Sequence, residues 1–192
     1  MARFSLLVLT LLLLSIQTVF GCPSGWVSHT NKCYLLSSFT TSWPTAETFF
    51  CTGCPSGWVS HTNKCYLLSS FTTSWPTAES YCRTFSAKLA EPMDQSSVNF
   101  LSGEVKGSAP LKNTNYYIGG GDLFVEGEWI WMSTQAPISV TNWNTGEPND
   151  LGGQEDCLEI IPPTGLWNDI LCSVQQGFIC EMDNEYAQSL IG

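Results

Sequence analysis

Three short stretches of this 192-residue chain, 147–150, 155–157 and 167–169, together carry seven side chains that end in a carboxylate or amide oxygen, with no Lys, Arg or His among or between them. Such a cluster repels itself unless a cation joins it. Hard divalent ions bind oxygen, with roughly six to eight ligands for Ca2+, whereas Zn2+ favours His and thiolate. The pattern therefore predicts a calcium site. The seven residues are Glu147, Asn149, Asp150, Glu155, Asp156, Asn168 and Asp169.

Glu147 and Asn149 flank Pro148. A cis bond before this proline would turn the chain sharply enough to aim both neighbouring oxygens at one ion, and the sequence leaves the isomer open. An amide ligand gives the metal its oxygen and keeps an NH2 donor, while a carboxylate ligand keeps a spare lone pair. The same residues could therefore hold an ion and hydrogen-bond a diol.

Three motifs, Glu147-Pro148-Asn149, Glu155 and Trp167-Asn168-Asp169, closely resemble the carbohydrate-recognition domain of C-type lectins. The resemblance covers about residues 54–182. It implies an α+β, C-type lectin-like fold in which two helices, small antiparallel sheets and a long calcium-binding loop region are stapled by disulfides.

The resemblance also implies a principal calcium site that binds sugar directly. In the family, Glu-Pro-Asn implies a mannose-type preference for glycans with equatorial 3- and 4-hydroxyls, such as mannose, GlcNAc and fucose, and Gln-Pro-Asp implies galactose. All members of the implied site except Asp169 would also hydrogen-bond the sugar. The site would consist of Glu147, Asn149, Glu155, Asn168 and Asp169.

An auxiliary calcium site is implied just after a run of three glycines, 119–121, which we expect to be flexible and where the family often has a larger residue. Glu128 and Glu159 fit neither ligand set, and we expect both to be exposed. The auxiliary site would consist of Asp122, Glu126, Asp150, Glu155 and Asp156.

Charge and composition narrow the function. The formal net charge is −10, and twelve Asp and Glu but no Lys, Arg or His follow Lys112, which argues against nucleic acid as a partner. The length and the 43% hydrophobic content suffice for one domain with a core. The two histidines, His29 and His61, lie in a duplicated segment and no nucleophile motif occurs, so we do not expect an enzyme.

The first 21 residues have the pattern of a signal peptide, with Arg3, an apolar run from Leu6 to Leu14, and Gly21 at the expected cut. The apolar run is too short to favour a membrane span, and no later stretch is long enough. We therefore expect a secreted, extracellular protein without a membrane span.

Residues 21–47 and 53–79 are identical over 27 positions. Identity at this length indicates a partial duplication or a faulty gene model, because stacked repeats drift and number three or more. Only one copy can fill one place in a fold. We expect the second copy to fill it, which makes 22–53 an appended segment, 54–183 the lectin domain and 184–192 a tail. The alternative is that the first copy fills the place and the second is extruded as a loop.

Within the domain, we expect a hairpin at 54–65 and a first helix from Trp75 with Ser74 as its N-cap. A short strand around Leu89 precedes a second helix, which begins after Asp94 and stops at Gly103. Further strands are expected from Tyr116, at 129–131 and around 177–179. Trp143 and Trp167 are expected to pack beneath the metal segment as core residues.

Nine cysteines leave one unpaired. That residue is Cys51, for which an intermolecular disulfide or mispairing is expected over a redox role with Cys54. Six cysteines in the domain allow fifteen pairings, so spacing alone does not decide them. The resemblance implies Cys54–Cys65, Cys82–Cys180 and Cys157–Cys172, with Cys22–Cys33 closing the same hairpin in the first copy.

The resulting hypothesis is a secreted, calcium-dependent lectin of mannose-type specificity that recognises microbial or cell-surface glycans. A homo-oligomer would strengthen binding by a shallow site. The chain also resembles perlucin-like invertebrate lectins. This gives the alternative of a structural, biomineral-associated protein that binds calcium carbonate surfaces.

Overall fold

The structure, a computed structural model, describes residues 26–29, 32–35, 49–50 and 54–184. The expected signal peptide, Cys22, Cys51 and residues 185–192 lie outside these ranges. Three short strands from the appended segment 22–53, β1 (Trp26–His29), β2 (Lys32–Leu35) and β3 (Phe49–Phe50), form an antiparallel sheet of their own. Residues 57–185 form a separate compact unit, which carries the candidate site.

The larger unit contains one sheet, whose main path runs β10-β9-β7-β11-β5-β4, with β6 beside β11 and β8 beside β7. The pairing of β7 with β11 is parallel, and the others are antiparallel. The strands are β4 (Val59–His61), β5 (Lys64–Leu68), β6 (Lys88–Leu89), β7 (Tyr116–Gly121), β8 (Ile130–Trp131), β9 (Cys157–Ile160), β10 (Trp167–Ile170) and β11 (Gly177–Asp183). The helices are α2 (Trp75–Arg83) and α3 (Gln95–Gly107). The second copy of the duplication, residues 53–79, thus supplies β4, β5 and the first part of α2.

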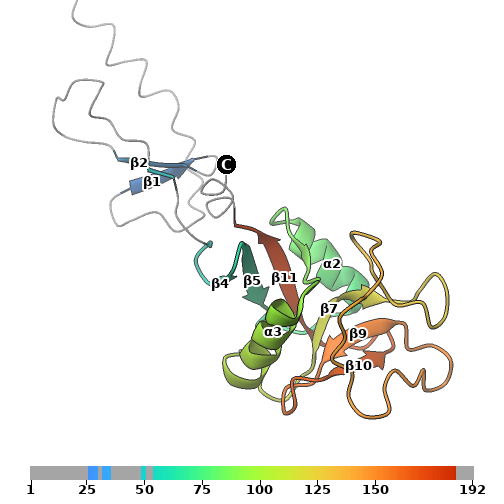
Figure 1. The fold of residues 1–192 in the computed structure, drawn as a ribbon. Helices are drawn as coiled ribbons and strands as arrows, with labels where there is room; N and C mark the ends of the chain where they lie inside the picture. Colours follow the sequence, from blue (N-terminus) through green and yellow to red (C-terminus); the bar gives the residue numbers. More distant parts are fainter. Residues whose placement is uncertain (1–25, 30–31, 36–48, 51–53, 185–192) are drawn as a thin grey trace, which may run out of the picture. The chain divides into compact units, whose positions relative to one another are not determined.

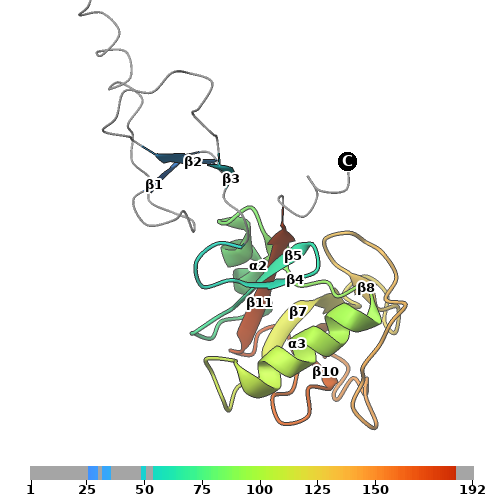
Figure 2. The same cartoon turned by 60° about the vertical axis from the view of Figure 1, so that its left-hand side comes forward.

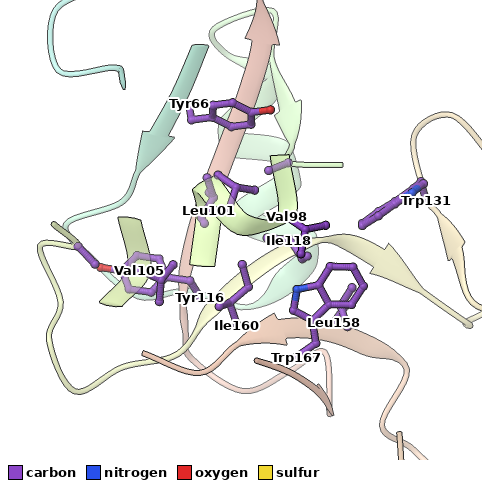
Figure 3. Packing of buried hydrophobic residues seen from close by; sticks show 13 residues of the cluster. Tyr66, Val98, Leu101, Val105, Tyr116, Ile118, Trp131, Leu158, Ile160 and Trp167 are labelled. Atoms are coloured by element: carbon purple, nitrogen blue, oxygen red, sulfur yellow. The ribbon is translucent and has the colours of Figure 1, made fainter. Parts of the chain in front are cut away.

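The central strands are buried on both faces, and α2 and α3 cover opposite faces (Figures 1 and 2). Successive side chains of a strand point to opposite faces. Accordingly, Tyr116 and Ile118 of β7 belong to the core cluster under α3, whereas Tyr117 belongs to the cluster under α2. Figure 3 shows the cluster under α3, in which Trp167 is one of the largest buried side chains.

Both helices begin where the sequence predicts. Ser74 is the N-cap of α2 and a proline follows in the first turn, although the Ser74 hydroxyl bonds the Thr77 hydroxyl and not a backbone N–H. Asp94 caps α3 by accepting a hydrogen bond from the Ser97 N–H at 2.8 Å. An oxygen at this position satisfies a backbone donor that has no partner within the helix.

The predicted stop of the second helix at Gly103 is wrong, because α3 continues to Gly107. The face that buries Val98 and Leu101 continues with Val105, which is also buried against the sheet. One glycine in a helix costs only about 1 kcal/mol, so the packing of the next turn outweighs it.

The three glycines at 119–121 are the end of strand β7 and are fully buried, so the predicted flexible run is also wrong. A Cβ atom at Gly121 would lie 2.6 Å from the backbone oxygen of Asp156, and one at Gly120 would lie 2.7 Å from the Leu158 side chain. The glycines therefore allow neighbouring segments to approach β7 closely. Small size, and not flexibility, is what this position requires.

Two disulfides join distant parts of the unit. Cys82 of α2 is bonded to Cys180 of β11, and Cys157 of β9 is bonded to Cys172. Both pairings are those that the family resemblance implies. Cys54 and Cys65 each take part in a disulfide, and the pairing of the two with one another stays a prediction. The Cys157–Cys172 bond closes the segment that contains Trp167, Asn168 and Asp169.

Candidate calcium and carbohydrate site

Asp169 is the fully buried centre of the candidate site. It lies on β10, which pairs with β9, so its backbone is fixed by the sheet. Its Oδ2 atom accepts hydrogen bonds from the backbone N–H groups of Asn149, at 2.9 Å, and Asp150, at 2.7 Å. Its Oδ1 atom is buried and has no hydrogen-bond partner among the described residues. Asp169 therefore ties the Glu-Pro-Asn loop to the sheet and keeps one carboxylate oxygen uncommitted.

The Glu-Pro-Asn loop brings a second carboxylate to Asp169. The bond between Glu147 and Pro148 is cis, which is the isomer that the sequence leaves open. The side-chain amide of Asn149 donates to the Glu147 carboxylate. Burial raises the pKa of Glu147, and the neighbouring carboxylates of Asp169 and Glu155 raise it further, while the bond from Asn149 lowers it. Three acidic groups thus act on one another at this loop.

Glu155 closes the turn that follows. Its Oε2 atom accepts from the Leu151 N–H at 2.8 Å, and its own N–H donates to Asp150 Oδ1 at 3.1 Å. Asp150 has a positive φ of 43°, a conformation that Asp tolerates better than most residues. These reciprocal bonds hold the carboxylates of Asp150 and Glu155 in place without help from a basic side chain.

Asn168 of the predicted principal set bonds other protein groups through its side-chain amide. Its amide nitrogen donates to Glu159 Oε1 at 3.1 Å and to the backbone oxygen of Asp169 at 2.6 Å. Both amide hydrogens are therefore used inside the protein. A hydrogen bond from Asn168 to a sugar would require one of these bonds to be exchanged.

Glu159 is buried with 1% of its surface exposed, so the prediction that it is exposed is wrong, whereas Glu128 is exposed as predicted. Burial raises the pKa of Glu159 to about 7, although hydrogen bonds from Asn115 and Asn168 lower it. Spacing alone missed this residue because the surrounding strand was not predicted. The alternation of Leu158 and Ile160 around it is the signal that could have placed Glu159 on the opposite, covered face of the sheet.

The residues predicted for the auxiliary site also lie near one another. Asp122 Oδ2 accepts from the Gly127 N–H at 2.9 Å, while its buried Oδ1 has no partner among the described residues. Burial raises the pKa of Asp122, and the charges of Asp156 and Asp150 raise it further. Desolvation raises the pKa of the exposed Glu126, and Asp122, Asp150 and Asp156 add to that effect. Four carboxylates thus repel one another here.

A family model decides what kind of domain surrounds these residues. Residues 71–182, more than half of the chain, match the Lectin C-type domain. The chain belongs to the C-type lectin family. It is similar to perlucin of Haliotis laevigata, with 36% identity over 173 residues that cover 88% of this chain and 89% of perlucin.

Solved C-type lectin structures share the fold. The carbohydrate-recognition domain of the mouse scavenger receptor C-type lectin superposes with a TM-score of 0.63 at 30% identity, covering 68% of this chain and 98% of that domain. The corresponding domain of cow CD23, determined in the presence of a GlcNAc2Man3 oligosaccharide, gives a TM-score of 0.61 at 31% identity, covering 69% and 98%. The predicted C-type lectin-like fold is therefore confirmed.

The donor atoms of this C-type lectin fit calcium in two respects. All predicted ligand atoms are oxygens, which Ca2+ prefers. Asp122 and Asp169 each bury one carboxylate oxygen that lacks a hydrogen-bond partner among the described residues, and such an atom is costly unless something binds it. Within the same described ranges, no group of three or more His, Cys, Asp or Glu side chains converges on one point. The carboxylates of the auxiliary set therefore lie near one another without converging on one point, and the principal set depends on the amide oxygens of Asn149 and Asn168 as well as on its carboxylates.

Tryptophan side chains next to the candidate site pack in the hydrophobic core, as predicted for Trp143 and Trp167. Trp167 is fully buried and contacts Trp131 and Trp143 edge to face, with ring centroids 6.0 and 5.8 Å apart. The backbone of Asn144 donates to the Trp167 oxygen at 2.8 Å, which joins the start of the Glu-Pro-Asn loop to β10. The Glu-Pro-Asn loop is therefore joined to the strand whose Trp167 packs against Trp131 and Trp143.

Proposed function

We propose that the chain is a secreted, calcium-dependent lectin of mannose-type specificity that recognises microbial or cell-surface glycans. One observation carries the proposal. The buried Asp169 carboxylate faces the Glu-Pro-Asn loop with one oxygen uncommitted, beside Glu147 and without a basic side chain after Lys112 to neutralise it. Membership of a family of carbohydrate-binding domains supports the same function.

In this proposal the protein holds Ca2+ with oxygens of Glu147, Asn149, Glu155, Asn168 and Asp169. A bound Ca2+ supplies coordination positions for two neighbouring sugar hydroxyls. Asp169 anchors the loop through the two N–H groups that it accepts, so it fixes where Asn149 lies. Glu147, Glu155 and Asn149 provide hydrogen-bond acceptors and a donor for the same hydroxyls. The Asp122 and Glu126 cluster would hold an auxiliary ion with Asp150, Glu155 and Asp156.

The Glu-Pro-Asn motif is the basis for the mannose-type specificity in the proposal, with mannose, GlcNAc and fucose as candidate ligands. The oligosaccharide present with the cow CD23 domain contains mannose and GlcNAc, and that domain is 31% identical to this chain. In the described part of the chain, no helix has the length and apolar character needed to cross a bilayer. The signal-peptide pattern of residues 1–21 remains the basis for proposing secretion.

The alternative, adsorption to calcium carbonate, rests on the similarity to perlucin and on the acidic second half of the chain. Burial of part of this acidic half weakens the electrostatic case for adsorption to calcium carbonate. Of the eleven acidic residues after Lys112 that the structure describes, five are buried and so cannot meet a flat mineral face: Asp122, Glu155, Glu159, Asp169 and Glu181. Adsorption to calcite that excess mannose does not reduce would favour this alternative.

Chromatography on mannose-agarose tests the proposal. Oxidised protein should be retained in Ca2+ and eluted by EDTA, and a glycan array with and without EDTA should give the same dependence. The double variant Glu147→Gln and Asn149→Asp should shift preference from mannose towards galactose, with Glu128→Gln as the exposed control. Retention that EDTA does not reverse, or a double variant with unchanged preference, would contradict the proposed mechanism.

A further inference from the structure

Glu159 occupies a position that neither predicted ligand set includes. It lies in the middle of β9, directly opposite Asn168 of β10 on one side and Tyr117 of β7 on the other. It is thus enclosed by the sheet on both sides, and only 1% of its surface is exposed. Glutamate is rarely buried so completely unless its carboxylate has a partner or a task.

The Glu159 carboxylate holds two side-chain amides. Its Oε1 atom accepts from Asn115 Nδ2 at 2.6 Å and from Asn168 Nδ2 at 3.1 Å. The second amide hydrogen of Asn168 is bonded to the Asp169 backbone oxygen at 2.6 Å. Because the nitrogen and oxygen of an amide point in different directions from the same carbon, these bonds turn the Asn168 amide oxygen away from Glu159.

Burying the Glu159 carboxylate in this way lowers the stability of the folded protein. No hydrogen bond of normal geometry reaches the buried Glu159 Oε2 from the described residues, although the Gln176 side chain lies near enough to lower the pKa of this carboxylate, and the nearby charge of Glu155 raises that pKa. No basic side chain forms an ion pair with Glu159 within the described ranges. A residue kept only for stability would be better replaced by an apolar side chain. Of the two amides that Glu159 accepts from, Asn115 and Asn168, only Asn168 belongs to the predicted calcium ligands.

We propose that Glu159 is a positioning residue of the calcium site, which fixes the Asn168 amide so that its oxygen and not its nitrogen faces the ion. This inference rests on the proposed calcium-dependent function. Residues that hydrogen-bond a metal ligand orient it, and their loss typically weakens metal affinity by about 10- to 100-fold. Asn168 without Glu159 could rotate and present a nitrogen that cannot coordinate a cation.

Two substitutions separate the hydrogen bond from the charge. Glu159→Gln keeps an acceptor oxygen for Asn115 and Asn168 and removes the charge, whereas Glu159→Met has a similar size and no strong acceptor. We expect Glu159→Gln to bind Ca2+ within about threefold of wild type and Glu159→Met to bind it about tenfold or more weakly. Calcium affinity is measured by calorimetry, and melting is measured separately in EDTA, where both variants should unfold close to the wild-type temperature.

Glu159→Asp is the second variant if Glu159→Met does not fold. It keeps the charge but withdraws the acceptor by one methylene, so it should also weaken calcium binding. Wild-type calcium affinity in Glu159→Met or Glu159→Asp would overturn the inference. So would an equal loss of affinity in Glu159→Gln and Glu159→Met. Failure of the wild-type protein to bind calcium would instead overturn the proposed function, so the two failures are distinguishable.

Discussion

Gly121 is the residue at which β7 makes its closest backbone approach to the acidic loop. A Cβ atom there would meet the Asp156 backbone oxygen at 2.6 Å, and the next residue, Asp122, donates its N–H to that same oxygen at 3.3 Å. One hydrogen atom in place of a methyl group therefore lets Asp122 and Asp156 lie close together. By contrast, a Cβ atom at Gly103 on α3 would meet nothing within 4 Å.

These two glycines give a matched prediction. Gly121→Ala should destabilise the protein by about 1–3 kcal/mol, because the obstructing atom belongs to the backbone and cannot rotate away. Gly103→Ala should stabilise it by about 0.5–1 kcal/mol, because alanine suits the middle of a helix. Urea unfolding in EDTA measures both changes. Equal stabilities for the two variants would show that β7 tolerates a side chain at this position.

At the scale of secondary-structure elements, β11 lies at the centre of the sheet and carries the buried Glu181. This strand pairs with β5, β6 and β7. The buried Glu181 carboxylate accepts from the Glu91 N–H at 3.0 Å and lies 3.4 and 3.5 Å from the ammonium groups of Lys64 and Lys88. Burial nevertheless raises the pKa of Glu181, and the two lysines only partly oppose it. The cost of burying the Glu181 charge therefore exceeds the attraction that Lys64 and Lys88 exert on it.

The raised pKa of Glu181 predicts how stability depends on pH. The folded protein holds this proton more tightly than the unfolded chain, so the contribution to stability is fully present below the ordinary value of 4.5 and is lost as pH rises through the folded-state pKa. In EDTA, Glu181→Gln should therefore flatten the change in melting temperature between about pH 4.5 and neutrality, while the exposed Glu128→Gln should not. An unchanged pH profile in Glu181→Gln would contradict this.

The sequence could predict the elements that carry local signals. Asp94 and Ser74 mark helix starts because capping chemistry is local. Strands β9 and β10 carry no such signal, since whether Glu159 lies opposite Asn168 depends on a pairing between chain segments. The buried network of Glu91 and Glu181 was missed for the same reason. The candidate ligand residues could be named from the resemblance, but the bonds of the Asn168 amide to Glu159 and to the Asp169 backbone could not.

Across the whole unit, one sheet buried on both faces places two uncommitted carboxylate oxygens, those of Asp122 and Asp169, beneath loops that contain no basic residue. Those loops are fixed by the Cys157–Cys172 disulfide and by the packing of Trp143 on Trp167. Most of the second copy of the duplicated segment forms part of this unit, and β1 to β3 of the appended segment form a separate sheet. We propose that these acidic loops require calcium.

Calorimetric titration of Ca2+ into oxidised, EDTA-stripped protein tests this claim most directly. The wild-type chain should take up calcium with a dissociation constant of about 10−4 to 10−3 M, the range of extracellular calcium modules. Asp169→Asn keeps an oxygen to accept from Asn149 and Asp150 but loses the charge, so it should remain folded and bind far more weakly. No calcium uptake by the wild-type protein, or equal uptake by Asp169→Asn, would contradict the account.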